Sequence, residues 1–143
     1  MHLSKIKLQE KDYPKASEIW EKSVIATHDF LKEKDILELK NEIPTYFKYV
    51  KAYLWFNDKE AIGFSGTNEK NLEMLFIDPK YFRNGYGTEI LQYLIQENKV
   101  HYVDVNKDNH NAVKFYAKNG FKKYKESQKD GQGRNYPILH LKL

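Results

Sequence analysis

The chain has 143 residues, of which 41% are hydrophobic and 15% aromatic, and it contains no cysteine. This length predicts a single domain, 1–143, because domains usually hold about 100–200 residues. The lack of cysteine excludes disulfide bonds, thiolate zinc sites and a cysteine nucleophile. Apolar runs are far shorter than the about 20 residues that span a membrane, and the N-terminus lacks the apolar stretch of a secretory signal. We therefore expect a cytoplasmic protein.

The formal net charge of +4 is unevenly distributed along the chain. Residues 114–143 carry eight Lys or Arg against two Asp or Glu. A basic C-terminal segment suits an anionic ligand, either a phosphorylated cofactor or a nucleic acid. Taken alone, such a charge distribution is more typical of a solvated lysine-rich surface, so charge does not decide the function.

Hydrophobic periodicity and turn residues predict alternating strands and helices along the chain. The central order of strand, helix, strand, helix favours an α/β fold, in which a mixed sheet has helices on both faces. Expected strands cover 3–8, 53–56, 61–66, 72–77, 100–105, 121–124 and 136–141, and expected helices cover 13–26, 85–98 and 109–118, with a further helix after residue 29.

The boundaries of that further helix are ambiguous in the sequence. Asp29 is a candidate N-cap, and Asp35 is a second position at which the helix could restart. After Pro44 the pattern changes to that of strands.

A glycine-containing segment, Phe82-Arg83-Asn84-Gly85-Tyr86-Gly87-Thr88, lies between an apolar strand and an amphipathic helix. Two glycines let the backbone approach a ligand, and the free N–H groups of the first helical turn face it. The segment therefore predicts an anion-binding loop, although a tight turn would use the same glycines. It lacks the third glycine of a dinucleotide fingerprint and the Gly-Lys-Ser/Thr of a Walker loop.

With this loop and two further segments, the chain resembles the GNAT superfamily of acetyl-CoA-dependent N-acetyltransferases. The segment 72–79 followed by Gly85-Tyr86-Gly87 is similar to the family's fourth strand and pyrophosphate loop. The pattern Asn109-x-x-Ala112-x-x-Phe115-Tyr116-x-Lys118-x-Gly120-Phe121 is similar to its helix-and-strand signature. Residues 20–31, with Arg134-x-Tyr136-Pro137, resemble the YjaB-like branch of the family.

The resemblance implies a mostly antiparallel sheet of about seven strands, splayed at an acetyl-CoA site. It implies that backbone N–H groups around 75–77 stabilise the thioester oxygen. The family pattern has Arg or Gln where this chain has Phe82, so the contact of that side chain cannot be carried over. The implied cofactor-binding residues are Leu75, Phe76, Ile77, Arg83, Asn84, Gly85, Tyr86, Gly87, Thr88, Asn109, Ala112 and Phe115.

Two of the matching residues have alternative structural roles. In the resemblance, Tyr116 matches the family's general acid. A phenol suits this role, because with a pKa of about 10 it is protonated at neutral pH and can donate to a leaving thiolate. It could instead be a core aromatic. Asn109 is expected to hydrogen-bond the amide arm of the cofactor, or to cap the helix that follows it, and the two roles are compatible.

The acceptor amine must lose a proton, and Glu73 on the fourth strand is the first candidate base, acting through water. It could also be an ordinary exposed strand residue. His28, between the first two helices, is the second candidate, although it could be a helix-junction histidine. Tyr136 is expected to line the same cleft. We propose no metal, because no cluster of His with Asp or Glu has ligand spacing.

The resemblance implies transfer of an acetyl group from acetyl-CoA to a primary amine by direct attack in a ternary complex. A small-molecule amine and a protein lysine or N-terminus fit the sequence equally well. The alternative is a non-catalytic coenzyme A sensor or nucleic-acid-binding module, since Tyr116, Phe121 and Tyr124 interleave with lysines. We consider nucleic acid the less favoured partner, and the chain could be a monomer or a homodimer.

Overall fold

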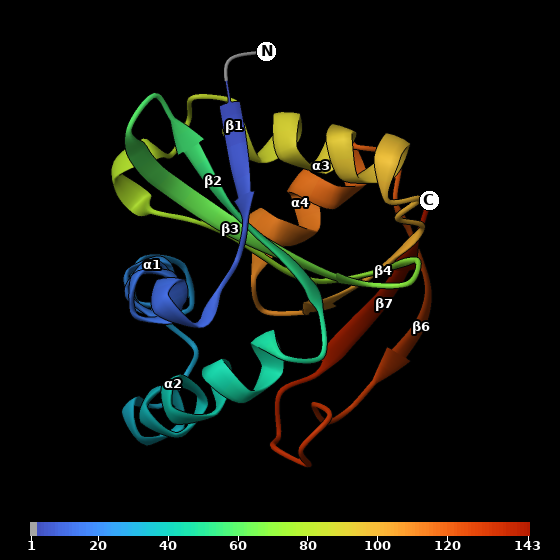
Figure 1. Ribbon diagram of the computed structural model, residues 1–143. Helices are drawn as coiled ribbons and strands as arrows, with labels where there is room; N and C mark the ends of the chain where they lie inside the picture. Colours follow the sequence, from blue (N-terminus) through green and yellow to red (C-terminus); the bar gives the residue numbers. More distant parts are fainter. Residues whose placement is uncertain (1–2) are drawn as a thin grey trace.

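The computed structural model describes residues 3–143. Met1 and His2, the first two residues of the N-terminus considered above, lie outside the described residues. Its elements follow the predicted order (Figure 1). The strands are β1 (Leu3–Lys7), β2 (Lys51–Asn57), β3 (Glu60–Asn68), β4 (Asn71–Ile77), β5 (Tyr102–Asn106), β6 (Lys122–Ser127) and β7 (Ile138–Lys142). The helices are α1 (Tyr13–Thr27), α2 (Glu33–Phe47), α3 (Tyr86–Glu97) and α4 (His110–Lys118), with 3₁₀ turns η1 (Glu10–Asp12) and η2 (Pro79–Tyr81).

The strands form one seven-stranded sheet in the order β1-β2-β3-β4-β5-β7-β6. Only β4 and β5 pair in parallel, and the other pairs are antiparallel. Helices α1 and α2 cover one face of the sheet, and α3 and α4 cover the other (Figure 1). The predicted mixed, mostly antiparallel sheet with helices on both faces is confirmed.

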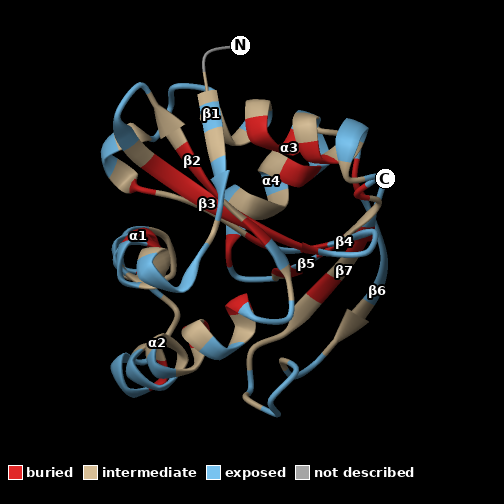
Figure 2. Cartoon of the chain, in the orientation of Figure 1, coloured by how far each residue is buried: buried red, intermediate tan, exposed pale blue. Residues whose placement is uncertain are grey.

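Each face of the sheet has its own hydrophobic core. On one face, Ile90, Leu91 and Leu94 of α3 are fully buried, as their helical spacing predicts. On the other face, Ile19 and Trp20 of α1 pack against the central strands. Buried residues are concentrated along the strands between these two layers (Figure 2). The sheet is therefore fixed from both sides near its centre.

The junction between α1 and α2 differs from the expectation. Helix α2 begins at Glu33 with Lys32 as its N-cap, so the prediction that Asp29 caps this helix is wrong, and Asp35 lies inside its first turn. Backbone N–H groups of Asp35 and Ile36 donate to the Lys32 carbonyl, which closes that turn. The residues between the helices form a short loop, whose position matters for the site below.

Helix α2 continues through Pro44 to Phe47. Proline removes one backbone hydrogen bond, but Ile43 and Phe47 on either side of it are buried in the core beneath α1 and α2. Burial of these two side chains stabilises the last turn by more than the missing hydrogen bond is worth.

An irregularity in β4 separates it from β5. Between Gly66 and Thr67 of β3 the register advances two residues on β4, from Met74 to Leu72, so Glu73 is the extra residue of a β-bulge. Pairing with β5 stops at the same place, after Leu72 and Val103. The two strands therefore diverge from Glu73 onward, which confirms the predicted splay.

Candidate active site

The diverging strands open into a cleft of about 720 Å³, a volume typical of small-molecule sites. It is bounded by β4, β5, the start of α3, the start of α4 and the end of α1. Of the residues singled out in the sequence, the cleft brings together Glu73, His28, Tyr116, Leu75, Phe76, Ile77, Arg83, Gly85, Tyr86, Gly87, Thr88, Asn109, Ala112 and Phe115. Asn84 does not line it, because its side-chain amide donates to the carbonyls of Tyr81 and Phe82.

The loop before α3 has the geometry of an anion-binding loop. Gly85 caps the helix with φ of 77°, a left-handed conformation that favours glycine. The first intrahelical bond runs from the Glu89 N–H to the Gly85 carbonyl, so the N–H groups of 86–88 have no helical acceptor. A Cβ at Gly87 would lie 3.5 Å from the ring of Phe115, inside the cleft. The residues present therefore fit a phosphate-bearing group.

The departure from the family pattern at Phe82 has a structural counterpart. Phe82 and Arg83 both line the cleft, and Arg83 adopts φ of 66°, which is uncommon for a residue other than glycine. A positive side chain is therefore available at this end of the cleft, one position later than in the family pattern. The backbone N–H groups at the start of α3 are independent of this change.

Backbone donors from β4 also face the gap between the strands. The Asp78 N–H donates to the Ile62 carbonyl of β3, and alternate residues of an antiparallel strand point the same way. The N–H of Phe76 is therefore directed at β3, which corrects its expected part as a donor. The N–H groups of Leu75 and Ile77 are directed away from β3, toward the open side.

Tyr116 is packed as a core aromatic, which is one of the two roles considered for it. Its ring packs against Phe115 and Phe121 at centroid distances of 5.1 and 5.7 Å, and only 7% of the residue is exposed. It nevertheless lines the cleft. Burial raises the pKa of its phenol above the ordinary value of 10, so it remains protonated at neutral pH. The geometry suits a proton donor held rigidly by the core.

Asn109 and His28 form a polar junction between α4 and α1. The Asn109 side-chain oxygen accepts from the Ala112 N–H at 3.2 Å, so the N-capping role is observed directly. Its Nδ2 lies 3.2 Å from Nε2 of His28, whose Nδ1 is 2.7 Å from the Thr27 hydroxyl. Burial lowers the pKa of His28 to about 4. His28 is therefore neutral at pH 7, and its Nε2 already accepts a hydrogen bond from Asn109.

Glu73 and Asp104 are two acidic side chains in the same cleft. Glu73 is the bulge residue of β4, and Asp104 follows the last residue of β5 that pairs with β4. Desolvation, and then the negative charge of Asp104, raise the pKa of Glu73. Asp104 was missed in the sequence because an acidic residue alternating with two valines reads as an ordinary exposed strand position.

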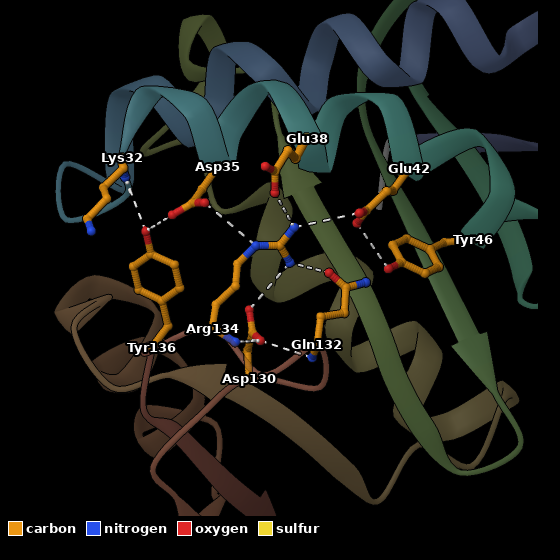
Figure 3. A network of polar contacts seen from close by, with 9 residues as sticks. All are labelled: Lys32, Asp35, Glu38, Glu42, Tyr46, Asp130, Gln132, Arg134 and Tyr136. Atoms are coloured by element: carbon orange, nitrogen blue, oxygen red, sulfur yellow. Dashed lines mark hydrogen bonds and ion pairs between the residues drawn. The ribbon is translucent and has the colours of Figure 1, made fainter.

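A polar network joins α2 to the loop between β6 and β7 (Figure 3). The guanidinium of Arg134, in the loop between β6 and β7, lies 2.9 Å from Glu38 and 3.7 Å from Asp35. The hydroxyl of Tyr136 donates to Asp35 and accepts from the Lys32 N–H. Tyr136 therefore links the loop between β6 and β7 to the start of α2. It does not line the cleft, contrary to expectation.

The chain is similar to known proteins across this site. An acetyltransferase (GNAT) domain model matches residues 18–136. The chain belongs to the GNAT acetyltransferase family. It is 32% identical to the peptidyl-lysine N-acetyltransferase YjaB of Escherichia coli over 86% of this chain and 84% of that protein. The solution structure of apo YjaB from E. coli matches with a TM-score of 0.90 and 29% identity, covering 99% and 97% of the two chains. The N-acetyltransferase PaiA of Thermoplasma acidophilum, crystallised with coenzyme A, matches with a TM-score of 0.73 and 21% identity over the full length of both chains.

This GNAT chain is an N-acetyltransferase with acetyl-CoA as its co-substrate. The stacking surface considered for nucleic acid is not formed, since Tyr116 and Phe121 are buried and only Tyr124 is exposed. Within residues 3–143, no group of three or more His, Cys, Asp or Glu side chains could hold a metal ion. Nor is any helix in that range long and apolar enough to cross a membrane.

Proposed function

We propose that this N-acetyltransferase modifies the side-chain amine of lysine in a peptide or protein by direct attack on the acetyl thioester. The observation that supports it most is the pair of acidic side chains, Glu73 and Asp104, in the cleft beside the Tyr116 phenol. A lysine amine carries a positive charge at neutral pH, which an acidic site attracts. The similarity to an enzyme named for peptidyl-lysine supports the same acceptor.

The proposed mechanism has two proton transfers, and a different side chain carries out each of them. Glu73 takes the proton that leaves the acceptor nitrogen as the N–C bond forms, directly or through one water molecule. The N–H groups of Leu75 and Ile77 donate to the thioester oxygen as it gains negative charge. Tyr116 donates its proton to the sulfur as the C–S bond breaks. We rank His28 below Glu73 as the base, because its Nε2 is engaged with Asn109.

The donor is held by the other half of the cleft. The N–H groups of 86–88, with Arg83, would bind the diphosphate, and Ala112 and Phe115 would pack along the pantetheine arm. When bound, acetyl-CoA supplies the activated acetyl group and a good leaving thiol. The cytoplasmic location and the monomeric or dimeric state remain predictions from the sequence.

Thiol release from acetyl-CoA tests the acceptor class. The panel pairs a peptide containing one lysine and a blocked N-terminus with the same peptide carrying acetyl-lysine, and adds a peptide with a free α-amine and a small polyamine. We expect release only with acceptors that have a free lysine side chain. Release with the polyamine alone would exclude the peptide acceptor, and no release with any amine would exclude the proposed function.

A further inference from the structure

A row of polar side chains crosses the sheet at the point where β4 and β5 diverge. Asp104 pairs in register with His140 of β7, and its neighbours Val103 and Val105 are buried in the core under α3 and α4. Because side chains alternate along a strand, Asp104 and His140 lie on the opposite face. Asp104 lines the cleft with Glu73.

His140 fixes the orientation of Asp104 through a short chain of hydrogen bonds. Its Nδ1 lies 2.6 Å from the Asp104 carboxylate, and its Nε2 lies 2.7 Å from the Ser127 hydroxyl. Because a carboxylate oxygen accepts hydrogen bonds, Nδ1 of His140 carries the hydrogen that it shares with Asp104. The His140 side chain is 19% exposed and that of Asp104 is 62% exposed. The imidazole is thus held within the protein while the carboxylate remains open to a ligand.

The two carboxylates of the cleft are therefore in different environments. The carboxylate of Asp104 accepts a hydrogen bond from His140, which fixes its orientation. Glu73 sits on the bulge, where protein atoms and the charge of Asp104 favour its protonated form. Two acids whose environments differ in this way can divide binding from proton transfer. Asp104, which is oriented by His140 and exposed to the cleft, suits a binding group. Glu73, whose pKa is raised, suits a group that exchanges a proton.

We propose that Asp104 binds the ammonium group of the acceptor before Glu73 deprotonates it, and that His140 and Ser127 are positioning residues that hold the Asp104 carboxylate. The proposal rests on the proposed lysine-acetyltransferase function and deepens it. It assigns the acceptor class to primary ammonium groups, which can donate to one carboxylate while facing the other.

The first test separates acceptor binding from turnover in the full-length protein. With a lysine peptide, Asp104→Asn should raise the acceptor KM about 10-fold or more, because it removes a charge-assisted hydrogen bond. The acetyl-CoA KM should change less than about 2-fold, since the diphosphate loop is elsewhere in the cleft. His140→Ala should raise the acceptor KM by about 3-fold, through loss of orientation alone. Asp108→Asn, which makes the same charge change outside the cleft, is the matched control.

The second test measures binding without turnover. Titration of Nα-acetyl-lysine amide into the wild-type protein should shift the imidazole ¹⁵N resonances of His140, and the shift should vanish in Asp104→Asn. Absence of the shift in the wild type, or an acceptor KM unchanged in Asp104→Asn, would overturn the proposal. A clear shift together with no thiol release from acetyl-CoA would instead leave the ammonium site standing and refute the acetyltransferase function proposed for lysine.

Discussion

The two halves of the cleft are built from different parts of the chain. In the donor half, the groups expected to touch the ligand are mainly backbone N–H groups, from the start of α3 and from Leu75 and Ile77. In the acceptor half they are side chains, namely Glu73, Asp104 and His28. Backbone donors survive most substitutions, whereas a carboxylate is removed by one. The donor half should therefore tolerate sequence change, and the acceptor half should determine specificity.

The largest effect is expected at the proposed base. Glu73→Gln retains the shape of the side chain but removes its ability to take a proton, so kcat with a lysine peptide should fall about 10³-fold. The wild-type rate should also fall as the pH drops through the pKa of Glu73, which lies above its ordinary value of 4.5. In the variant, the pH–rate profile should lack this fall in rate at low pH, its acidic limb. Acetyl-CoA binding, measured by thermal shift, should be unchanged; a variant that keeps both its rate and its acidic limb would exclude Glu73 as the base.

Tyr116→Phe tests the residue that lies between the two halves. The ring remains packed against Phe115 and Phe121, so the fold and the cofactor affinity should be retained. Loss of the phenolic proton should lower kcat about 10²-fold. A thioester whose leaving thiol has a lower pKa should restore part of the rate, because its thiolate needs less help from an acid. Unchanged turnover of acetyl-CoA would remove Tyr116 from the acid role.

His28 tests whether the acceptor half depends on buried, neutral side chains. Its pKa is about 4 in the folded chain and about 6.5 when unfolded, so the unfolded state binds the proton first as the pH falls. The free energy of unfolding should fall by about 3 kcal/mol from this residue between pH 7 and pH 4. Denaturant titrations of His28→Asn should lack this component.

His110→Asn is the matched control, because His110 is an exposed residue at the start of α4. It should follow the pH dependence of the wild type. If His28→Asn also follows the wild type between pH 7 and pH 4, then His28 is not held neutral by burial, and its junction with Asn109 contributes little to stability.

The difference between the halves also explains what the sequence could predict. The donor half is encoded locally: the glycine at 85, the helix that follows and the Asn109 cap are all read from neighbouring residues. The strands and helices were predicted for the same reason, since periodicity is local. The bulge at Glu73 has no local signal, because it depends on which residues of β3 face it.

The acceptor half depends on contacts between residues far apart in the chain. Tyr136 was expected in the cleft, yet it donates to Asp35, which lies 101 positions away. Asp104 gains its partner His140 only when β5 pairs with β7, 36 positions away. Side-chain pairs at such separations leave no spacing pattern in a single sequence, so the sheet order must be known first.

The smallest effect is expected in the donor half, at Gly87. This residue is in the first turn of α3 without a positive φ, so alanine should stabilise the helix by about 0.5–1 kcal/mol. The added Cβ would lie 3.5 Å from the Phe115 ring, an ordinary contact within the protein, but it would occupy space where the diphosphate should approach the backbone. Gly87→Ala should therefore raise the Tm by about 2–5 °C while weakening acetyl-CoA binding about 10-fold.

A higher Tm together with weaker acetyl-CoA binding distinguishes a ligand-binding glycine from one that only permits a turn. Gly131→Ala is the matched control, because a Cβ there meets nothing within 4 Å and the residue lies outside the cleft. It should leave acetyl-CoA affinity unchanged in a calorimetric titration. If Gly87→Ala binds acetyl-CoA as tightly as the wild type, then the start of α3 does not hold the diphosphate, and the donor half must use side chains such as Arg83 after all.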